Sequence, residues 1–338
     1  MNNPYRDFKD RSFWARSISL GSIVDLLDDQ KPYLNRGDKV VSMGSCFAAN
    51  MVPHLLESGI QYVFSEKIPR QLHPIRHHFN YESFSARYGN IYTSRQMVQL
   101  LQRSVGDFEP FAEPWLEDGA YIDPYRPGLA FPAKSLAEYR FVIENHLACV
   151  RKAIADATVL VITLGLTETW SDLENGAALP ACPGTIAGEF DSEKYQLLRL
   201  EVEDVYGDLV KIMDLVGRIN QEVKILISVS PVPLVATATN EHVLLANTFS
   251  KSILRVAAGR FVREIENARY IPAYEIVTGP QAPDSYFEAS RRDVSELGVN
   301  AVMSHFLSGV QTSEPIHVST KITNLLKIEC EEEVQARG

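Results

Sequence analysis

Five short apolar runs, separated by longer amphipathic segments, dominate this chain of 338 residues. The runs occupy residues 40–43, 62–64, 159–163, 224–229 and 270–277. Each run except the second is followed by a small or polar loop and then by an amphipathic stretch, which is the pattern of repeated βα units. Such repeats fold as a parallel sheet with helices on both faces. We therefore predict a single α/β domain with a five-stranded parallel sheet.

Helical spacing of apolar residues marks the segments between these runs. We expect helices over residues 47–58, 136–155, 195–219, 242–265 and 295–307. The core of the domain then spans about residues 38–310. Residues 311–338 include three consecutive glutamates, and we expect them to form a solvated, peripheral C-terminal tail.

Two segments do not fit the βα repeat. Residues 66–132 are rich in proline, glycine and aromatic side chains and contain one expected helix, at 94–103. Residues 170–191 carry Asn-Gly and Pro-Gly turn signals. Long insertions with little regular structure are often lids or substrate walls. We therefore expect the first insertion to form a lid or a substrate wall.

The charge balance and the cysteines argue against several classes of function. A formal net charge of −10 offers no basic face for nucleic acid. No apolar run approaches the roughly 20 residues of a membrane span, and the polar first residues do not resemble a secretory signal. Four scattered cysteines without Cys-x-x-Cys spacing favour a reduced compartment. We expect a cytoplasmic protein without a metal ion or cofactor.

The segment Gly-Ser-Cys-Phe-Ala at residues 44–48 joins the first apolar run to the first expected helix. A serine on a tight turn between a strand and a helix holds its hydroxyl at the sheet edge, beside the N–H groups of the helix start. This geometry is that of an acyl-transfer nucleophile, so Ser45 is the candidate. Two other interpretations remain open: Ser45 caps the helix, or Cys46 is the nucleophile, its thiol pKa lowered by the helix N-terminus.

The same segment resembles the signature of the GSCFA family. Other blocks that resemble the family are residues 87–93, 163–168, 182–184, 230–234 and 250–252, so the resemblance runs in order from about residue 40 to about residue 308. The family is similar to the SGNH (GDSL-like) hydrolases. The resemblance implies a three-layer, flavodoxin-like α/β fold with strand order 2-1-3-4-5, and serine ester or acyl chemistry at the carboxyl edge of the sheet.

An esterase of this kind needs donors for the developing oxyanion. The backbone N–H of Cys46 is one candidate. Gly89 and Asn90 resemble the second SGNH block, and Gly165 and Thr167 lie in the third. Thr167 stands where SGNH enzymes usually have an asparagine, so Gly89 and Asn90 are the stronger candidates.

The general base is not at its usual place. Counting back from Gly298 puts Asp293 where SGNH enzymes have their histidine. His242 is the best replacement, because it follows the loop at the carboxyl end of the fourth run, and it matches a histidine of this block in the family. Glu168 or Asp293 would orient its ring. An exposed histidine at a helix start is the alternative interpretation.

We therefore predict a serine esterase or acyltransferase that acts on an O-acyl ester, for example an acetyl ester, of a carbohydrate or another small molecule. Aromatic side chains in the first insertion, among them Tyr88, Tyr92 and Trp115, suit stacking on a sugar ring. Lys251 lies on one face of the helix that His242 starts and would meet an anionic group. The alternative is a ligand-binding protein that keeps the SGNH-like cleft but has lost hydrolysis.

Overall fold

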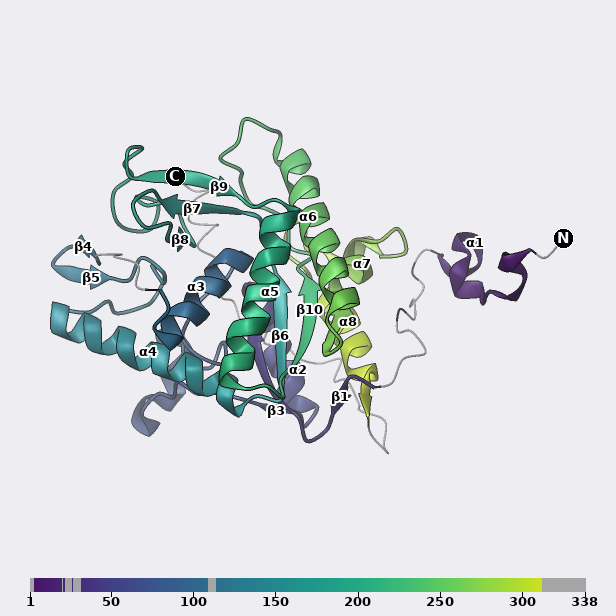
Figure 1. The fold of residues 1–338 in the computed structure, drawn as a ribbon, viewed down its shortest axis with the longest axis horizontal. Coiled ribbons are helices and arrows are strands. Elements are labelled where there is room, and N and C mark those ends of the chain that lie inside the picture. Colours follow the sequence, from purple (N-terminus) through teal and green to yellow (C-terminus); the bar gives the residue numbers. More distant parts are fainter. Residues whose placement is uncertain (1–2, 20, 22–25, 27–31, 109–113, 312–338) are drawn as a thin grey trace.

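A computed structural model describes residues 3–19, 21, 26, 32–108 and 114–311. Its centre is a five-stranded parallel sheet (Figure 1). The strands are β2 (Lys39–Met43), β3 (Gln61–Tyr62), β6 (Val159–Leu164), β10 (Lys224–Val229) and β11 (Ala268–Ile271). They lie side by side in the order β3-β2-β6-β10-β11, which is the expected order 2-1-3-4-5. The predicted fold class is thus confirmed.

Helices cover both faces of this sheet. On one face lie α3 (Ser94–Val105), α4 (Leu136–Asp156), α5 (Val202–Ile219) and α6 (Val243–Glu264), packed in a single hydrophobic cluster. On the other face lie α2 (Cys46–Glu57), α7 (Ala273–Thr278) and α8 (Glu296–Ser308). All six residues of β6 are buried, because a central strand between two helical layers meets side chains on each face.

Two of the sequence predictions were wrong in detail. Residues 195–199 were expected to begin a helix, but Tyr195–Arg199 forms strand β9, which pairs with β7 (Glu168–Asp172). Residues 270–277 were expected to be one strand. Pro272 ends that strand instead and precedes α7, because proline has no N–H to donate to the sheet ladder.

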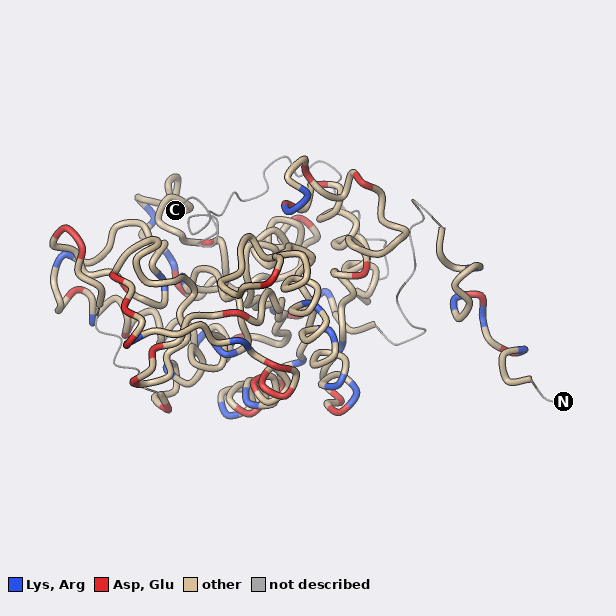
Figure 2. The backbone as a smooth tube through the Cα atoms, turned by 90° about the horizontal axis from the view of Figure 1, so that it is seen from above, with Lys and Arg blue, Asp and Glu red and all other residues tan. Residues whose placement is uncertain are grey.

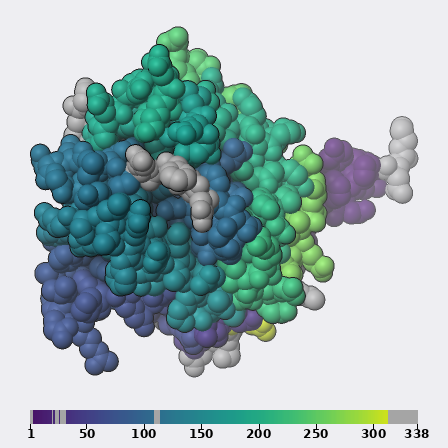
Figure 3. Space-filling view, turned by 60° about the vertical axis from the view of Figure 1, so that its left-hand side comes forward, coloured from purple at the N-terminus to yellow at the C-terminus, as the bar shows by residue number. Residues whose placement is uncertain are grey.

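The two insertions lie together on one side of the molecule, where Figure 3 shows blue and green parts of the chain in contact. The first contains η3 (Arg70–Phe79), α3, β4 (Trp115–Glu117) and β5 (Ala120–Ile122). The second contributes β7 and β8 (Ala178–Leu179) to a three-stranded antiparallel sheet with β9. Gln99 joins the two, because its side chain bonds the carbonyl of Gly176 at 2.8 Å and the N–H of Ala178 at 2.8 Å.

The remaining elements are short. They are η1 (Pro4–Asp7), η2 (Asp10–Ser12), α1 (Trp14–Ser17), β1 (Leu34–Asn35), η4 (Asp284–Tyr286) and β12 (Val310–Gln311). In Figure 1, α1 lies apart from the sheet and its helices. Strands β1 and β12 pair in parallel. The predicted C-terminal tail falls, from residue 312 on, outside the described residues.

Charged residues of both signs are interspersed along the chain (Figure 2). None of the helices in the described ranges combines the length and the apolar character that a membrane span requires. Among the described residues, Cys46, Cys149 and Cys182 form no disulfide bond.

Candidate functional site

Ser45 lies where the sequence predicted, between the end of β2 and the start of α2. Its backbone carbonyl accepts the first helical hydrogen bond, from the N–H of Ala48 at 2.8 Å. Its side chain makes no capping hydrogen bond, so helix capping does not account for this serine. The residue is 4% exposed. The hydroxyl is therefore enclosed at the carboxyl edge of the sheet.

Two glycines allow the chain to pack closely around Ser45. A Cβ atom on Gly44 would lie 2.8 Å from the carbonyl oxygen of Thr163, at the end of the adjacent strand β6. A Cβ atom on Gly165 would lie 2.9 Å from the carbonyl oxygen of Tyr92 and 3.6 Å from the Oγ atom of Ser45. The missing side chain of Gly165 thus leaves room for the Ser45 hydroxyl at the end of β6.

Two of the candidate oxyanion donors already have hydrogen-bond partners within the protein. The N–H of Gly165 donates to the carbonyl of Tyr92 at 3.1 Å, and the N–H of Thr167 donates to the Oγ atom of Ser250 at 3.2 Å. Both N–H groups therefore stabilise the backbone around them. Gly89 has φ of 67°, a left-handed conformation that favours glycine.

The segment with Asn90 is joined directly to the turn that carries Ser45. The N–H of Ile91 donates to the carbonyl of Gly44 at 2.9 Å. Asn90, one residue earlier, is 4% exposed. Cys46 is half-buried and begins α2 directly after Ser45. The structure therefore brings Ser45, Asn90 and Gly165 into one region.

Lys251 is buried rather than open to a ligand. It is 1% exposed, and its ammonium group donates to the carbonyl of Gly165 at 2.7 Å and to the carbonyl of Val232 at 2.7 Å. Gly165 follows β6 and Val232 follows β10. The side chain of Lys251 therefore links, by hydrogen bonds, the loops at the carboxyl ends of two neighbouring strands.

Glu168 and His242 lie at the same edge, on different segments. The carboxylate of Glu168 accepts from the Oγ1 atom of Thr237 at 2.9 Å. Thr237 belongs to the loop that leads from β10 to His242. His242 is exposed, and its Nδ1 atom accepts from the N–H of Leu244 at 3.2 Å, which caps α6. The carboxylate of Glu168 therefore fixes the loop before His242.

Asp293 lies on an exposed turn before α8. Its Oδ2 atom accepts from the Oγ atom of Ser290 at 2.9 Å, and its Oδ1 atom is 3.5 Å from the guanidinium of Arg292. Its side chain is 53% exposed. These contacts are local to the turn.

The aromatic residues singled out in the first insertion have different surroundings. The hydroxyl of Tyr88 donates to the carbonyl of Ser42 in the interior. Tyr92 is also buried, and its carbonyl accepts from the N–H groups of Gly165 and Leu166. The ring of Trp115 packs against Gly188, whose added Cβ would lie 2.7 Å from that ring.

A cavity of about 200 Å³ opens at this edge of the sheet. Its lining combines apolar and polar side chains from the segments after β6 and β10 and from the second insertion. They include Tyr92, Leu166, Glu168, Trp170, Cys182, Thr185, Leu234 and Thr237. Trp170 was not singled out in the sequence, although it lies two residues after Glu168. The mixed lining suits a small organic ligand with polar groups.

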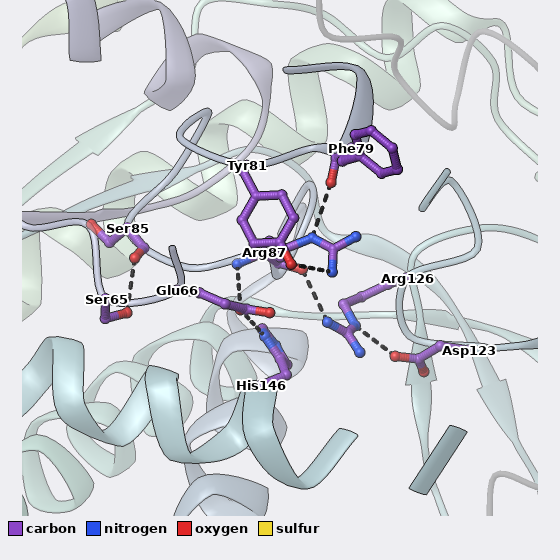
Figure 4. A network of polar contacts seen from close by, with 9 residues as sticks. All are labelled: Ser65, Glu66, Phe79, Tyr81, Ser85, Arg87, Asp123, Arg126 and His146. Carbon is purple, nitrogen blue, oxygen red and sulfur yellow. Dashed lines mark hydrogen bonds and ion pairs between the residues drawn. The ribbon is translucent and has the colours of Figure 1, made fainter. Parts of the chain in front are cut away.

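Sequence reasoning missed a buried polar network between the first insertion and α4 (Figure 4). The Nδ1 atom of His146 lies 2.7 Å from the Oε2 atom of Glu66, and both side chains are buried. The Nε atom of Arg126 donates to Asp123 at 2.6 Å, and its Nη1 atom donates to the carbonyl of Arg87 at 3.2 Å. Only the pair Asp123 and Arg126, three residues apart, had a local signal.

Burial determines the protonation of this network. It lowers the pKa of His146 to about 4, and the neighbouring Arg126 guanidinium acts in the same direction. Although burial alone would raise it, the pKa of Glu66 is lowered, because its carboxylate accepts from His146 and from the N–H of Arg87. Near neutral pH a neutral imidazole thus donates its Nδ1–H to an ionised carboxylate.

The described part of the chain contains no group of three or more His, Cys, Asp or Glu side chains placed to hold a metal ion.

Comparisons with known proteins agree with the resemblance seen in the sequence. The family model described as "GSCFA family" matches residues 39–306. No curated protein matches the chain. Among solved structures, the chain is similar to the crystal structure of a carbohydrate esterase family 3 from Talaromyces cellulolyticus, with 10% sequence identity and a TM-score of 0.29. That match covers 79% of this chain and 93% of the other.

Proposed function

The chain belongs to the GSCFA family, and from the site at the edge of its sheet we propose that it is a serine esterase or acyltransferase. The observation that carries this proposal is the position of Ser45. Its hydroxyl lies at the start of α2, makes no capping bond and faces Gly165. A helix N-terminus beside a serine hydroxyl favours the negative charge that develops on an attacked carbonyl oxygen.

In the proposed reaction, the Oγ atom of Ser45 attacks the carbonyl carbon of the ester and gives its proton to the base. The backbone N–H groups of Cys46 and Gly89 and the side chain of Asn90 stabilise the oxyanion. When the intermediate collapses, the alcohol leaves with the proton from the base, and the acyl group stays on Ser45. Water or a second alcohol then takes the acyl group, so the same residues serve hydrolysis and transfer.

We assign the base to His242, because it begins α6 after the loop that Glu168 holds through Thr237. Its Nδ1 atom is engaged in the helix cap, so the Nε2 atom would accept the proton. Ser45 is 4% exposed and His242 is exposed. The proposal therefore requires the hydroxyl of Ser45 to become accessible to the ester and to His242 when the ester binds.

The proposed substrate is an O-acyl ester of a carbohydrate or another small molecule. The cavity of about 200 Å³ offers Trp170 for stacking on a sugar ring and Glu168, Thr185 and Thr237 for its hydroxyl groups. We propose a cytoplasmic location, which is supported by the lack of a disulfide bond at the described cysteines Cys46, Cys149 and Cys182.

Hydrolysis of p-nitrophenyl esters from acetyl to medium chain length tests this function, together with labelling by an organophosphonate. We expect the Ser45→Ala variant to lose about 10³-fold or more of the activity and all of the label. Ser104→Ala is the matched control, because Ser104 is a buried serine on α3 whose hydroxyl donates to the carbonyl of Leu101 on the same helix. Equal activity of the wild type and Ser45→Ala would contradict the proposal.

A second candidate function is ligand binding without hydrolysis. Two observations favour it: the hydroxyl of Ser45 is enclosed, and Asp293, at the usual position of the SGNH histidine, contacts only neighbouring residues of its own exposed turn in the described structure. In this case acetylated sugars would give saturation-transfer signals with the protein but would remain intact. Release of acetate in the same samples would exclude this candidate.

A further inference from the structure

A second, smaller cavity lies beside the first, between α3, α4 and the loop that follows β5. Its volume is about 30 Å³. Its lining residues are Tyr88, Asn90, Ile91, Gln96, Leu100, Arg103, Tyr125, Arg126, His146, Ala178 and Pro180. Gln96 and Pro180 also line the larger cavity, so the two cavities are neighbours.

Three buried polar atoms at this small cavity have no hydrogen-bond partner among the residues that the structure describes. They are the Nη2 atom of Arg126, the Nε2 atom of His146 and the Oη atom of Tyr125. Arg126 is 4% exposed and His146 is 1% exposed. A buried polar atom without a partner is costly, most of all on a charged group. Three such atoms around one cavity indicate a site built for a ligand.

The network of Figure 4 shows which polar atoms of Arg126 and His146 are already engaged. The guanidinium of Arg126 uses Nε on Asp123 and Nη1 on the carbonyl of Arg87, which leaves Nη2 for the cavity. The imidazole of His146 uses Nδ1 on Glu66, which leaves Nε2.

Tyr125 is held in a similar way. Its N–H donates to the Oδ1 atom of Asp123 at 3.0 Å. The guanidinium carbon of Arg103 lies 4.1 Å from the centre of its ring. All three groups are therefore held in place by contacts within the protein, as in a preorganised binding site.

The chemistry of these atoms defines the ligand. Arg126 and Tyr125 each offer a hydrogen to donate, whereas the Nε2 atom of a neutral His146 offers a lone pair. A carboxyl group matches this set, because its oxygens accept from Arg126 and Tyr125 and its proton is shared with His146. We propose that this cavity binds a small carboxylic acid, with the carboxyl group on Arg126, Tyr125 and His146.

The size of the cavity limits the acid. A water molecule needs at least about 10–15 Å³ of such volume, so a cavity of about 30 Å³ has room for two or three water-sized positions in all. Because covalently bonded atoms overlap, a small acid with three or four heavy atoms occupies about this space. Formate and acetate are acids of this size. The site contains neither Ser45 nor His242, so the proposal stands or falls independently of the esterase activity.

Proton uptake is the signature of this binding mode. Glu66, Arg126, Asp123 and Tyr88 are charged or titratable groups near His146, and Arg103 and Tyr125 line the same cavity. Since the free imidazole is neutral near pH 7, an acetate ion must bring one proton from solution to share it with Nε2. Its affinity should therefore fall about tenfold for each unit of pH above neutrality.

Isothermal titration of acetate into the full chain tests the proposal, in buffers that differ in ionisation enthalpy and contain no carboxylate. We expect saturable binding, uptake of one proton for each acetate, and at least tenfold weaker binding of neutral acetamide. Binding without proton uptake, or equal binding of acetate and acetamide, would overturn the proposal.

Tyr125→Phe is the decisive variant, because it removes a hydroxyl that has no partner in the described protein and so should leave the fold intact. We expect acetate affinity to fall about 10- to 100-fold, the range for a hydrogen bond to a charged group. Tyr139→Phe is the matched control, because Tyr139 is a half-buried tyrosine nearby that lines a different cavity. Equal affinities of Tyr125→Phe and wild type would contradict the proposal, because the acid would then not bind through Tyr125. Absence of saturable binding to the wild type would show that the cavity holds water rather than an acid.

Discussion

The Nζ atom of Lys251 donates a hydrogen bond to the carbonyl oxygen of Gly165 at 2.7 Å, deep under the edge of the sheet. The same ammonium group holds the carbonyl of Val232. We therefore expect Lys251→Met, which keeps most of the apolar part of the side chain but lacks the ammonium group, to lower the free energy of unfolding by about 2–4 kcal/mol, because two buried carbonyls lose a charged donor. Urea denaturation measures this change.

Lys211→Met is the control for that prediction. Lys211 forms a salt bridge with Asp214 on the exposed side of α5, at 3.2 Å. Exposed pairs contribute about 0–1 kcal/mol. Comparable destabilisation by the two variants would show that the buried hydrogen bonds of Lys251 contribute no more stability than an exposed salt bridge.

Gly165→Ala is expected to lower both stability and ester turnover. The added Cβ would lie 2.9 Å from the carbonyl oxygen of Tyr92, which is backbone and cannot move away cheaply, and it would approach the Ser45 hydroxyl. Overpacking of this kind costs about 1–3 kcal/mol. Thermal unfolding and p-nitrophenyl ester hydrolysis are the measurements.

The matched glycine is Gly217 on α5, where an added Cβ meets no atom within 4 Å. Gly217→Ala should stabilise the protein by up to about 1 kcal/mol, because alanine favours a helix over glycine. If Gly165→Ala were as stable as Gly217→Ala, close packing around Ser45 would not require glycine.

His242→Asn separates the two roles open to this histidine. Asparagine is a preferred helix N-cap, so the variant should keep the stability of α6 that the Nδ1 atom of His242 supports. If His242 is the general base, ester turnover should fall about 10²- to 10⁴-fold. Full activity in a stable His242→Asn variant would leave His242 with the capping role only.

Acid should destabilise the protein through His146. Because the pKa of His146 is about 4 in the folded protein and 6.5 is the ordinary value, the unfolded chain binds more protons between these two pH values. The free energy of unfolding therefore falls as the pH falls from 6.5 towards 4, by up to about 3 kcal/mol from this group.

Urea denaturation at several pH values, on the wild type and on His146→Asn, measures this contribution. The variant keeps an amide that can donate to Glu66 but does not titrate, so its stability should depend less steeply on pH than that of the wild type. Parallel pH profiles of the two proteins would rule out His146 as the source.

Much of the fold could be predicted from the sequence. Strands β2, β6 and β10 and helices α2, α4 and α6 follow apolar runs and helical spacing, because the backbone period repeats in the sequence itself. The exceptions are instructive. Residues 195–199 carried a helical pattern, yet pairing with β7 made them a strand, since a partner strand brings hydrogen bonds that no local pattern encodes.

The position of Ser45 was determined by its sequence context, because a serine between a strand and a helix must lie at the sheet edge. What surrounds it was decided by tertiary structure. The sequence places Lys251 on one face of a helix but does not show what that face contacts. In the folded protein, the loops after β6 and β10 bring two carbonyl groups to its ammonium group. Glu66 and His146 are 80 residues apart, and only the packing of the first insertion against α4 joins them. Such pairs leave no periodic trace in the sequence, because their contact depends on the path of the whole chain between them.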